Sequence, residues 1–327
     1  MPQTALITGA TGLLGRQVLN AFQRDSANWK VFGQGFSRAT GTGTGMGAGT
    51  AAADSEVEIV KADLLDEDSL VTLLERTKPN VVVHCAANRF PDKCEQNPAA
   101  ARKINVAATQ SLAQATSTRS ILLIYISTDY VFPGRPGEAP YAASAQTDPP
   151  NIYGETKRDG EVAVLEQTRE SGLGVVLRVP VLYGPAKQNS ESAVNVLVDA
   201  VWKAQDAGAR IKVDDWAIRY PTHTADVGRV CRDIAVKYLS KAGAPGVPGQ
   251  LKVLPRILQF SSEDRMTKYQ ICQKLAEILG VPLPGMIPVR EGLKLGEVQR
   301  PYDTHLSTEE LKRIGIEVGT QSFEAWW

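Results

Sequence analysis

Short apolar stretches alternate with helix-like stretches along the first half of this 327-residue chain. Strands separated by helices form a parallel sheet that is covered on both faces, and right-handed crossovers make such a sheet doubly wound. The expected fold class is therefore α/β. The predicted strands are 5–8, 30–36, 57–61, 81–86, 121–127 and 175–179, and the predicted helices are 13–24, 69–76, 99–115 and 153–172.

The pattern changes near residue 183, where prolines and loops become frequent. We expect residues 1–182 to form a Rossmann-type domain that binds a dinucleotide. Residues 183–327 are expected to form a smaller, mixed C-terminal domain of the substrate-binding type, with residues 211–240 returning to the first domain. The predicted helices of this second half are 192–204, 225–239 and 268–279.

Residues 40–53 are rich in glycine, threonine and alanine. They lack the Lys-Ser/Thr pair of a phosphate loop, and no helical pattern follows them directly. We therefore expect a flexible surface insertion between the second and third strands. Residues 242–249, rich in glycine and proline, are expected to form a loop.

Charge and composition exclude several classes of protein. Lysine plus arginine and aspartate plus glutamate both total 36, so the net charge is zero and binding to nucleic acid or to a membrane surface is not expected. No apolar run approaches the roughly 20 residues that span a bilayer, and no secretory leader is visible, so a cytoplasmic location is expected. The cysteines have no CxxC spacing and the three histidines are scattered, which favours structural thiols and no metal site.

Three glycines follow the first predicted strand at the spacing GxxGxxG, namely Gly9, Gly12 and Gly15. Glycine permits a tight turn and lets the backbone approach a pyrophosphate, whose charge the following helix N-terminus stabilises. The alternative is a purely structural turn. The candidate cofactor-binding residues in this turn are Gly9, Thr11, Gly12, Leu13, Leu14 and Gly15.

The end of the second strand indicates which dinucleotide binds. An acid there would bind the ribose 2′-hydroxyl of NAD, but the chain has Ser37 and Arg38 instead. Guanidinium binds phosphate through paired hydrogen bonds, so NADP is favoured over NAD. The alternative is that Arg38 is a solvated loop cation.

Further candidate cofactor-binding residues follow the later strands. Asp63 and Leu64 are placed to hold the adenine edge, and Ala86 and Ala87 leave room for a closely passing cofactor. Asn105 is a candidate for bonding backbone near the site, although capping or packing explains Asp63 and Asn105 equally well. Arg178 and Pro180, at the end of the strand 175–179, complete the candidates.

Tyr153 and Lys157 are four residues apart and so lie on one face of a helix. A lysine ammonium about 5–6 Å from a tyrosine contributes roughly 3 kcal/mol at an effective dielectric near 20, which lowers the tyrosine pKa. Tyr153 would then donate a proton to a carbonyl oxygen while Lys157 holds the nicotinamide ribose. Thr128, at the end of a buried strand, is expected to hydrogen-bond the same oxygen. The alternative for the pair is a solvated helix face.

These motifs resemble the extended short-chain dehydrogenase/reductases over nearly the whole chain. Within that superfamily, the sequence Ser127-Thr128-Asp129-Tyr130-Val131-Phe132 resembles the dTDP-4-dehydrorhamnose reductase branch. That resemblance implies that Thr128, Tyr153 and Lys157 are catalytic and that Asp129 assists. The C-terminal residues Gln299-Arg300-Pro301 and Leu306-Ser307 resemble the substrate region of the same branch.

Motifs in both halves resemble, more closely, the family of methionine adenosyltransferase regulatory β subunits. They include Thr8 to Arg16, His84-Cys85-Ala86-Ala87, Glu191-Ser192-Ala193-Val194, Tyr220-Pro221-Thr222-His223 and Met266-Thr267-Lys268-Tyr269. This resemblance implies a reductase fold that binds NADP and associates with the catalytic subunit, which makes S-adenosylmethionine. It also implies a partner contact through Phe323, Trp326 and Trp327, and the alternative is that these aromatics pack on their own domain. The chain departs from the family pattern in the 40–53 insertion and in a shorter tail.

Two hypotheses follow. The first is an NADP-bound regulatory subunit of methionine adenosyltransferase. The second is an NADPH-dependent reductase of a nucleotide-linked keto sugar, and the retained Thr128, Tyr153 and Lys157 do not decide between them. A sugar-nucleotide epimerase or dehydratase is disfavoured, because a dehydratase needs a glutamate where Tyr130 follows Asp129.

Overall fold

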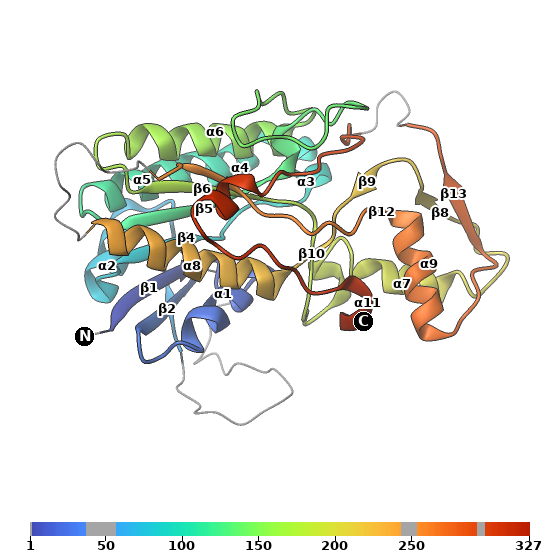
Figure 1. The fold of residues 1–327 in the computed structure, drawn as a ribbon, viewed down its shortest axis with the longest axis horizontal. Coiled ribbons are helices and arrows are strands. Elements are labelled where there is room, and N and C mark those ends of the chain that lie inside the picture. Colours follow the sequence, from blue (N-terminus) through green and yellow to red (C-terminus); the bar gives the residue numbers. More distant parts are fainter. Residues whose placement is uncertain (1, 37–56, 243–253, 293–297) are drawn as a thin grey trace.

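A computed structural model describes residues 2–36, 57–242, 254–292 and 298–327 of the chain. Within these residues, seven parallel strands form one sheet in the order β11-β6-β5-β4-β1-β2-β3 (Figure 1). The α/β doubly wound fold is thereby confirmed. The strands are β1 (Gln3–Thr8), β2 (Trp29–Gly35), β3 (Glu58–Lys61), β4 (Val81–His84), β5 (Leu122–Thr128), β6 (Gly174–Val179) and β11 (Ile257–Gln259).

Helices cover both faces of the sheet, because the strands are apolar on both sides. On one face α1 (Leu13–Gln23) packs against α8 (Thr224–Ala242), and on the other α5 (Ala108–Ser117) packs against α2 (Glu67–Thr77) and α6 (Ile152–Gln167). The carboxyl ends of the strands therefore form one open edge, where ligands bind in such folds.

The predicted helix 99–115 is interrupted in the structure. It consists of α4 (Pro98–Arg102), the π-helical turn η1 (Lys103–Ala107) and α5, and α3 (Pro91–Gln96) precedes it. Pro91 and Pro98 stand in the first turns of their helices, where a missing N–H costs nothing. Single π-turns inside helices frequently mark functional positions.

The described residues that follow β6 also form three two-stranded pairings. β7 (Leu182–Tyr183) pairs with β10 (Thr222–His223), β9 (Ile218–Arg219) with β12 (Met266–Thr267), and β8 (Ile211–Asp214) with β13 (Met286–Val289). A short helical turn, η2 (Asp129–Val131), follows β5. The other helical elements of the described residues are η3 (Asn189–Glu191), α7 (Val196–Lys203), α9 (Lys268–Leu279), α10 (Glu309–Arg313) and α11 (Phe323–Trp326).

The predicted return of residues 211–240 to the first domain stays a prediction. Within that range β8 pairs with β13, whereas α8 packs on α1; further along the chain, β11 extends the sheet next to β6. Hydrophobic side chains of α8 share one core cluster with β1, β4 and β5. The predicted insertion at 40–53 and nearly all of the predicted loop at 242–249 lie outside the described residues.

Candidate functional site

In the turn between β1 and α1, Gly9 and Gly15 lie so close to neighbouring backbone that only glycine fits there. Gly9 has a φ of +62°, and a Cβ on it would lie 2.8 Å from the backbone nitrogen of Ala86. A Cβ on Gly15 would lie 2.2 Å from the carbonyl oxygen of Gly9. The N-cap of α1 is Gly12, and neither a capping side chain nor an acid occupies its first turn. This helix N-terminus is therefore suited to hold an anion.

Gln34 of β2 holds the glycine turn in place through hydrogen bonds. Its side-chain oxygen accepts the Gly9 N–H at 3.1 Å, and its amide nitrogen donates to the carbonyl of Ala62 at 2.6 Å. Its backbone carbonyl accepts from Ala10 at 3.0 Å. The sequence analysis did not identify Gln34, because a single polar residue in a strand carries no motif.

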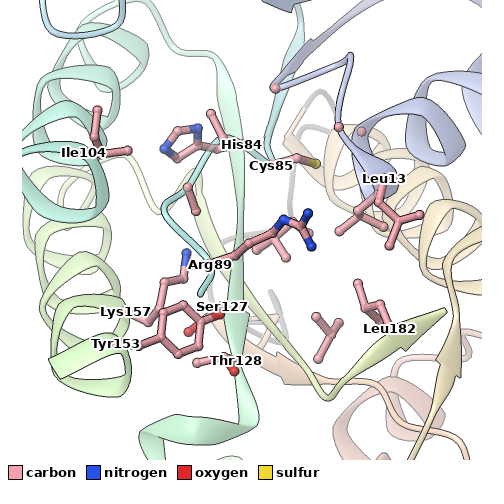
Figure 2. Close-up of a pocket in the computed structure, with 18 of the residues that line it drawn as sticks. Leu13, His84, Cys85, Arg89, Ile104, Ser127, Thr128, Tyr153, Lys157 and Leu182 are labelled. Carbon is pink, nitrogen blue, oxygen red and sulfur yellow. The ribbon is translucent and has the colours of Figure 1, made fainter. Parts of the chain in front are cut away.

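A cavity of about 600 Å³ runs along the carboxyl ends of the strands from this turn to α6. That volume lies within the range of small-molecule sites. Figure 2 shows Tyr153 and Lys157 projecting from one helix into the cavity, with the Tyr153 ring beside Thr128 and Leu13 on the opposite side. The candidate residues that line it are Gly9, Thr11, Gly12, Leu13, Leu14, Gly15, Asp63, Leu64, Ala86, Ala87, Thr128, Asp129, Tyr153, Lys157 and Pro180.

Asn105, in the π-helical turn, is not among the lining residues and instead connects two segments beside the cavity. Its side-chain oxygen accepts the Asn88 N–H at 2.8 Å. Its amide nitrogen donates to the Asn88 carbonyl at 2.9 Å and to the Thr156 hydroxyl at 3.0 Å. Asn105 thus ties the loop after β4 to the helix that carries Tyr153.

Arg178 also lies away from the cavity lining. It forms a buried ion pair with Glu161, with N–O distances of 2.9 and 2.7 Å, and Ser127 donates to the same carboxylate at 2.5 Å. Its remaining nitrogen donates to the Ala143 carbonyl. The side chain therefore joins β6 to α6. Ser37 and Arg38, on which the preference for NADP depends, lie outside the described residues.

Thr128 and Asp129 stand at the end of β5. The Thr128 hydroxyl donates to Asp129 at 3.0 Å, and the Thr304 hydroxyl donates to the other carboxylate oxygen at 2.6 Å. Burial raises the pKa of Asp129, and these hydrogen bonds oppose the rise. Because Thr304 lies 175 residues further along the chain, Asp129 links the C-terminal part of the chain to the end of β5.

Burial dominates the ionisation of Tyr153 and Lys157. It raises the pKa of Tyr153, which a hydrogen bond with Thr128 opposes, and it lowers the pKa of Lys157 to about 7. The pKa of Tyr153 is therefore shifted upward in the isolated chain and not downward, because loss of hydration is the largest contribution to it. Tyr153 is consequently a protonated donor at neutral pH.

Other lining residues come from positions that carried no expected role. His84 accepts or donates between the hydroxyls of Thr8 and Thr109, at 2.7 and 3.0 Å, and burial lowers its pKa to about 3, so the ring is neutral. Burial raises the pKa of the Cys85 thiol to about 12, so this cysteine stays protonated. Arg89, Leu182, Glu191 and Ala193 also line the cavity.

The C-terminal aromatics pack on their own domain. Phe323 is 2% exposed and lies 5.0 Å from the Tyr183 ring, measured between centroids. Trp326 contacts the rings of Tyr183 and His223 at 5.3 and 5.2 Å, and Trp327 lies edge-on to Trp326. The packing interpretation of the tail therefore holds in the isolated chain.

Neither a metal site nor a membrane span emerges from the described part of the chain. Its histidines, cysteines and acids form no group of three or more that suits a metal ion. None of its helices combines the length and the apolar character that crossing a bilayer requires. All four cysteines are free thiols.

Comparisons with known proteins agree with this geometry. The family described as the RmlD substrate binding domain matches residues 3–325. Methionine adenosyltransferase 2 subunit beta of Rattus norvegicus is 38% identical over 312 residues, covering 95% of this chain and 82% of the relative.

Two proteins named as dTDP-4-dehydrorhamnose reductases are also similar to the chain. The dTDP-4-dehydrorhamnose reductase of Streptomyces griseus is 32% identical over 222 residues, which cover 68% of this chain and 62% of the relative. The crystal structure of the same enzyme from Bacillus anthracis, in complex with NADP, has a TM-score of 0.74 at 21% identity and covers 99% of this chain and 96% of its own. This chain belongs to the RmlD substrate binding domain family and, within it, to the family of methionine adenosyltransferase β subunits.

Proposed function

We propose that this protein is the regulatory subunit of a methionine adenosyltransferase, that it binds NADP in the cavity, and that it modulates S-adenosylmethionine synthesis through a complex with the catalytic subunit. The observation that carries the proposal is the likeness to named β subunits across 95% of the chain, together with an intact dinucleotide-type cavity. A cytoplasmic location stays a prediction from the sequence.

The cavity residues fit a nicotinamide dinucleotide. The glycine turn leaves room for a pyrophosphate where a Cβ would collide with backbone, and α1 presents its N-terminus there. Asp63 and Leu64 would face the adenine end, and Tyr153 and Lys157 would face the nicotinamide ribose. The choice of NADP over NAD rests on Ser37 and Arg38. Titration calorimetry with both dinucleotides tests it, and Arg38→Ala should remove the preference.

Co-purification tests the regulatory role. The catalytic subunit of the same organism, co-expressed with this chain, should elute with it as one complex at micromolar concentration. The complex should differ from the catalytic subunit alone in its rate of S-adenosylmethionine synthesis at limiting methionine. No complex at that concentration would contradict the proposal.

Sugar reduction is the second candidate, because Thr128, Tyr153 and Lys157 line one cavity. The dinucleotide would supply a hydride to the carbonyl carbon. Tyr153, which burial keeps protonated, would give its proton to the carbonyl oxygen, and the product is an alcohol. NADPH absorbance with dTDP-4-dehydrorhamnose measures this activity. Tyr153→Phe should abolish it, and turnover that survives the change would exclude the mechanism.

The C-terminal tail is the proposed site of partner contact. Phe323 is buried against Tyr183, so its side chain is covered unless the tail moves. Trp326 and Trp327 remain partly exposed and are the better candidates for contact. Comparing complex formation by Trp327→Ala with that of the wild type tests their role.

A further inference from the structure

The segment between β7 and α7, residues 185–193, borders the cavity and is here called the strap. Hydrogen bonds between the residues at its two ends hold these ends together. Asn195 donates to the Gly184 carbonyl at 2.9 Å, and the Ser192 hydroxyl donates to the Leu182 carbonyl at 2.7 Å. Glu191 and Ala193, near the end of the strap, line the cavity.

Arg16 connects the strap to the first domain. One of its terminal nitrogens lies 2.6 Å from the Glu191 carboxylate and also donates to the Pro185 carbonyl at 3.3 Å. The other donates to the Thr11 carbonyl in the glycine turn at 2.7 Å. A single guanidinium therefore holds both the beginning and the end of the strap against the turn where α1 starts.

Glu191 gathers further bonds on the same side. Its carboxylate also accepts the backbone N–H of Lys187 at 3.1 Å, which fixes its rotamer within the strap. Arg89, from the loop after β4, donates to the Glu191 carbonyl. Figure 2 shows the Arg89 side chain reaching into the cavity between Lys157 and Leu13. Segments that follow β1, β4 and β7 thus meet at one residue.

The charges of Arg16 and Glu191 distinguish two roles that Glu191 could have in dinucleotide binding. The side chains of Arg16 and Glu191 are 20% and 11% exposed, so solvent screens their ion pair only weakly. A carboxylate beside the glycine turn repels the pyrophosphate of a dinucleotide. If Glu191 acted only through its charge, it would weaken binding. If Glu191 instead holds the strap closed, it should slow the dissociation of the dinucleotide.

We propose that Glu191 and Arg16 form a latch that holds the strap at the edge of the cavity and sets the rate at which a bound dinucleotide leaves. The inference rests on the proposed binding of NADP. With the latch closed the dinucleotide is a slowly exchanging component of the protein. Opening the strap breaks the Arg16 contacts to Glu191 and Pro185 and exposes the cavity along the side of the glycine turn.

Dissociation kinetics test the latch on the full-length protein. NADPH bound to the wild type is displaced by excess NADP, and the loss of its fluorescence gives the dissociation rate. Glu191→Gln keeps the size of the side chain but removes its charge, and should speed dissociation about tenfold, which is the loss of one charge-assisted hydrogen bond. Arg16→Gln should do the same, and the double variant should be no faster than either single one.

Controls separate the latch from other effects. Asp233→Asn removes an acid that pairs with two other partly buried arginines, Arg229 and Arg232 on α8, and should leave the rate within twofold. Circular dichroism and thermal unfolding verify that each variant is folded. A Glu191→Gln rate equal to or slower than the wild-type rate would overturn the latch while leaving NADP binding intact. Wild-type protein that binds no NADPH would contradict the proposed function itself, and the latch with it.

Discussion

The ammonium of Lys157 lies 4.1 Å from the centroid of the Tyr125 ring. Tyr125 is a fully buried residue of β5, and its hydroxyl donates to the Lys157 carbonyl at 3.4 Å. The cation is therefore held over an aromatic face with little water around it. Burial lowers the pKa of Lys157 to about 7, so its charge is half-lost at neutral pH. The cavity consequently contains a group that changes charge in the physiological range.

This depressed pKa predicts a pH-dependent cost in stability. The unfolded lysine titrates near 10.5 and the folded one near 7, so the destabilisation is complete below pH 7 and disappears as pH rises to 10.5. Lys157→Met should therefore raise the free energy of unfolding, by up to the order of 5 kcal/mol below pH 7, and by almost nothing near pH 10.5. Urea unfolding across this pH range measures the difference.

Lys203→Met is the matched control, because Lys203 is exposed on α7 and its replacement should change stability by less than about 0.5 kcal/mol at every pH. A gain from Lys157→Met that is constant between pH 6 and pH 10 would show that the lysine titrates normally.

The glycine turn gives the second prediction. A Cβ at Gly15 would lie 2.2 Å from the Gly9 carbonyl oxygen, so Gly15→Ala must push the turn away from α1. We expect dinucleotide affinity to fall by at least about 100-fold, since close backbone approach provides the pyrophosphate contacts. Titration calorimetry measures this loss. Gly292→Ala is the control, because its Cβ meets nothing nearer than 3.5 Å; equal losses from both variants would contradict the steric argument.

Much of this architecture was predictable because it depends on local pattern. The strands and the glycine turn follow from periodicity and spacing, and Tyr153 and Lys157 share a helix face at any helical phase. The π-helical turn at Asn105 was not predictable, because it depends on contacts with Asn88 and Thr156 from distant segments.

Longer-range contacts were hidden for the same reason. Arg16 and Glu191 are 175 residues apart in the sequence and meet only in the folded chain. In the sequence Gln34 is an ordinary strand residue, and its role appears only in the fold, where it accepts a hydrogen bond from the Gly9 N–H. The tertiary burial that reverses the expected pKa change at Tyr153 is likewise invisible in the sequence.

The bonds of Asn105 give the third prediction. Asn105→Ala leaves the buried Thr156 hydroxyl and the Asn88 backbone with fewer partners, and should lower the free energy of unfolding by about 2–3 kcal/mol. It should also weaken dinucleotide binding, because the loop after β4 is released. Chemical denaturation and calorimetry measure both effects. Thr156→Ser retains the hydroxyl and should be nearly silent, and an equally large effect there would point to packing.

Arg178 is expected to stabilise the fold without binding cofactor. Glu161→Gln leaves the buried guanidinium without its counter-charge and should cost about 3–5 kcal/mol of unfolding free energy. Replacing both residues, with Glu161→Leu and Arg178→Met, should cost less, since no charge is left buried. Urea unfolding ranks the variants. Dinucleotide affinity should match the wild type in every variant that folds, and a selective loss of affinity on changing Arg178 would restore it as a cofactor ligand.

The C-terminal tail gives the last prediction. Phe323 fills a cluster with Tyr183, Leu197 and Leu275, so Phe323→Ala should lower the free energy of unfolding by about 3–5 kcal/mol. Trp327→Ala removes a partly exposed ring and should cost far less. Thermal unfolding of the isolated chain separates these effects from binding to the catalytic subunit, which is measured in parallel at a temperature where all variants are folded. Loss of binding on Trp327→Ala with unchanged stability would assign the tail to the interface, whereas loss only on Phe323→Ala would make the tail a support of its own domain.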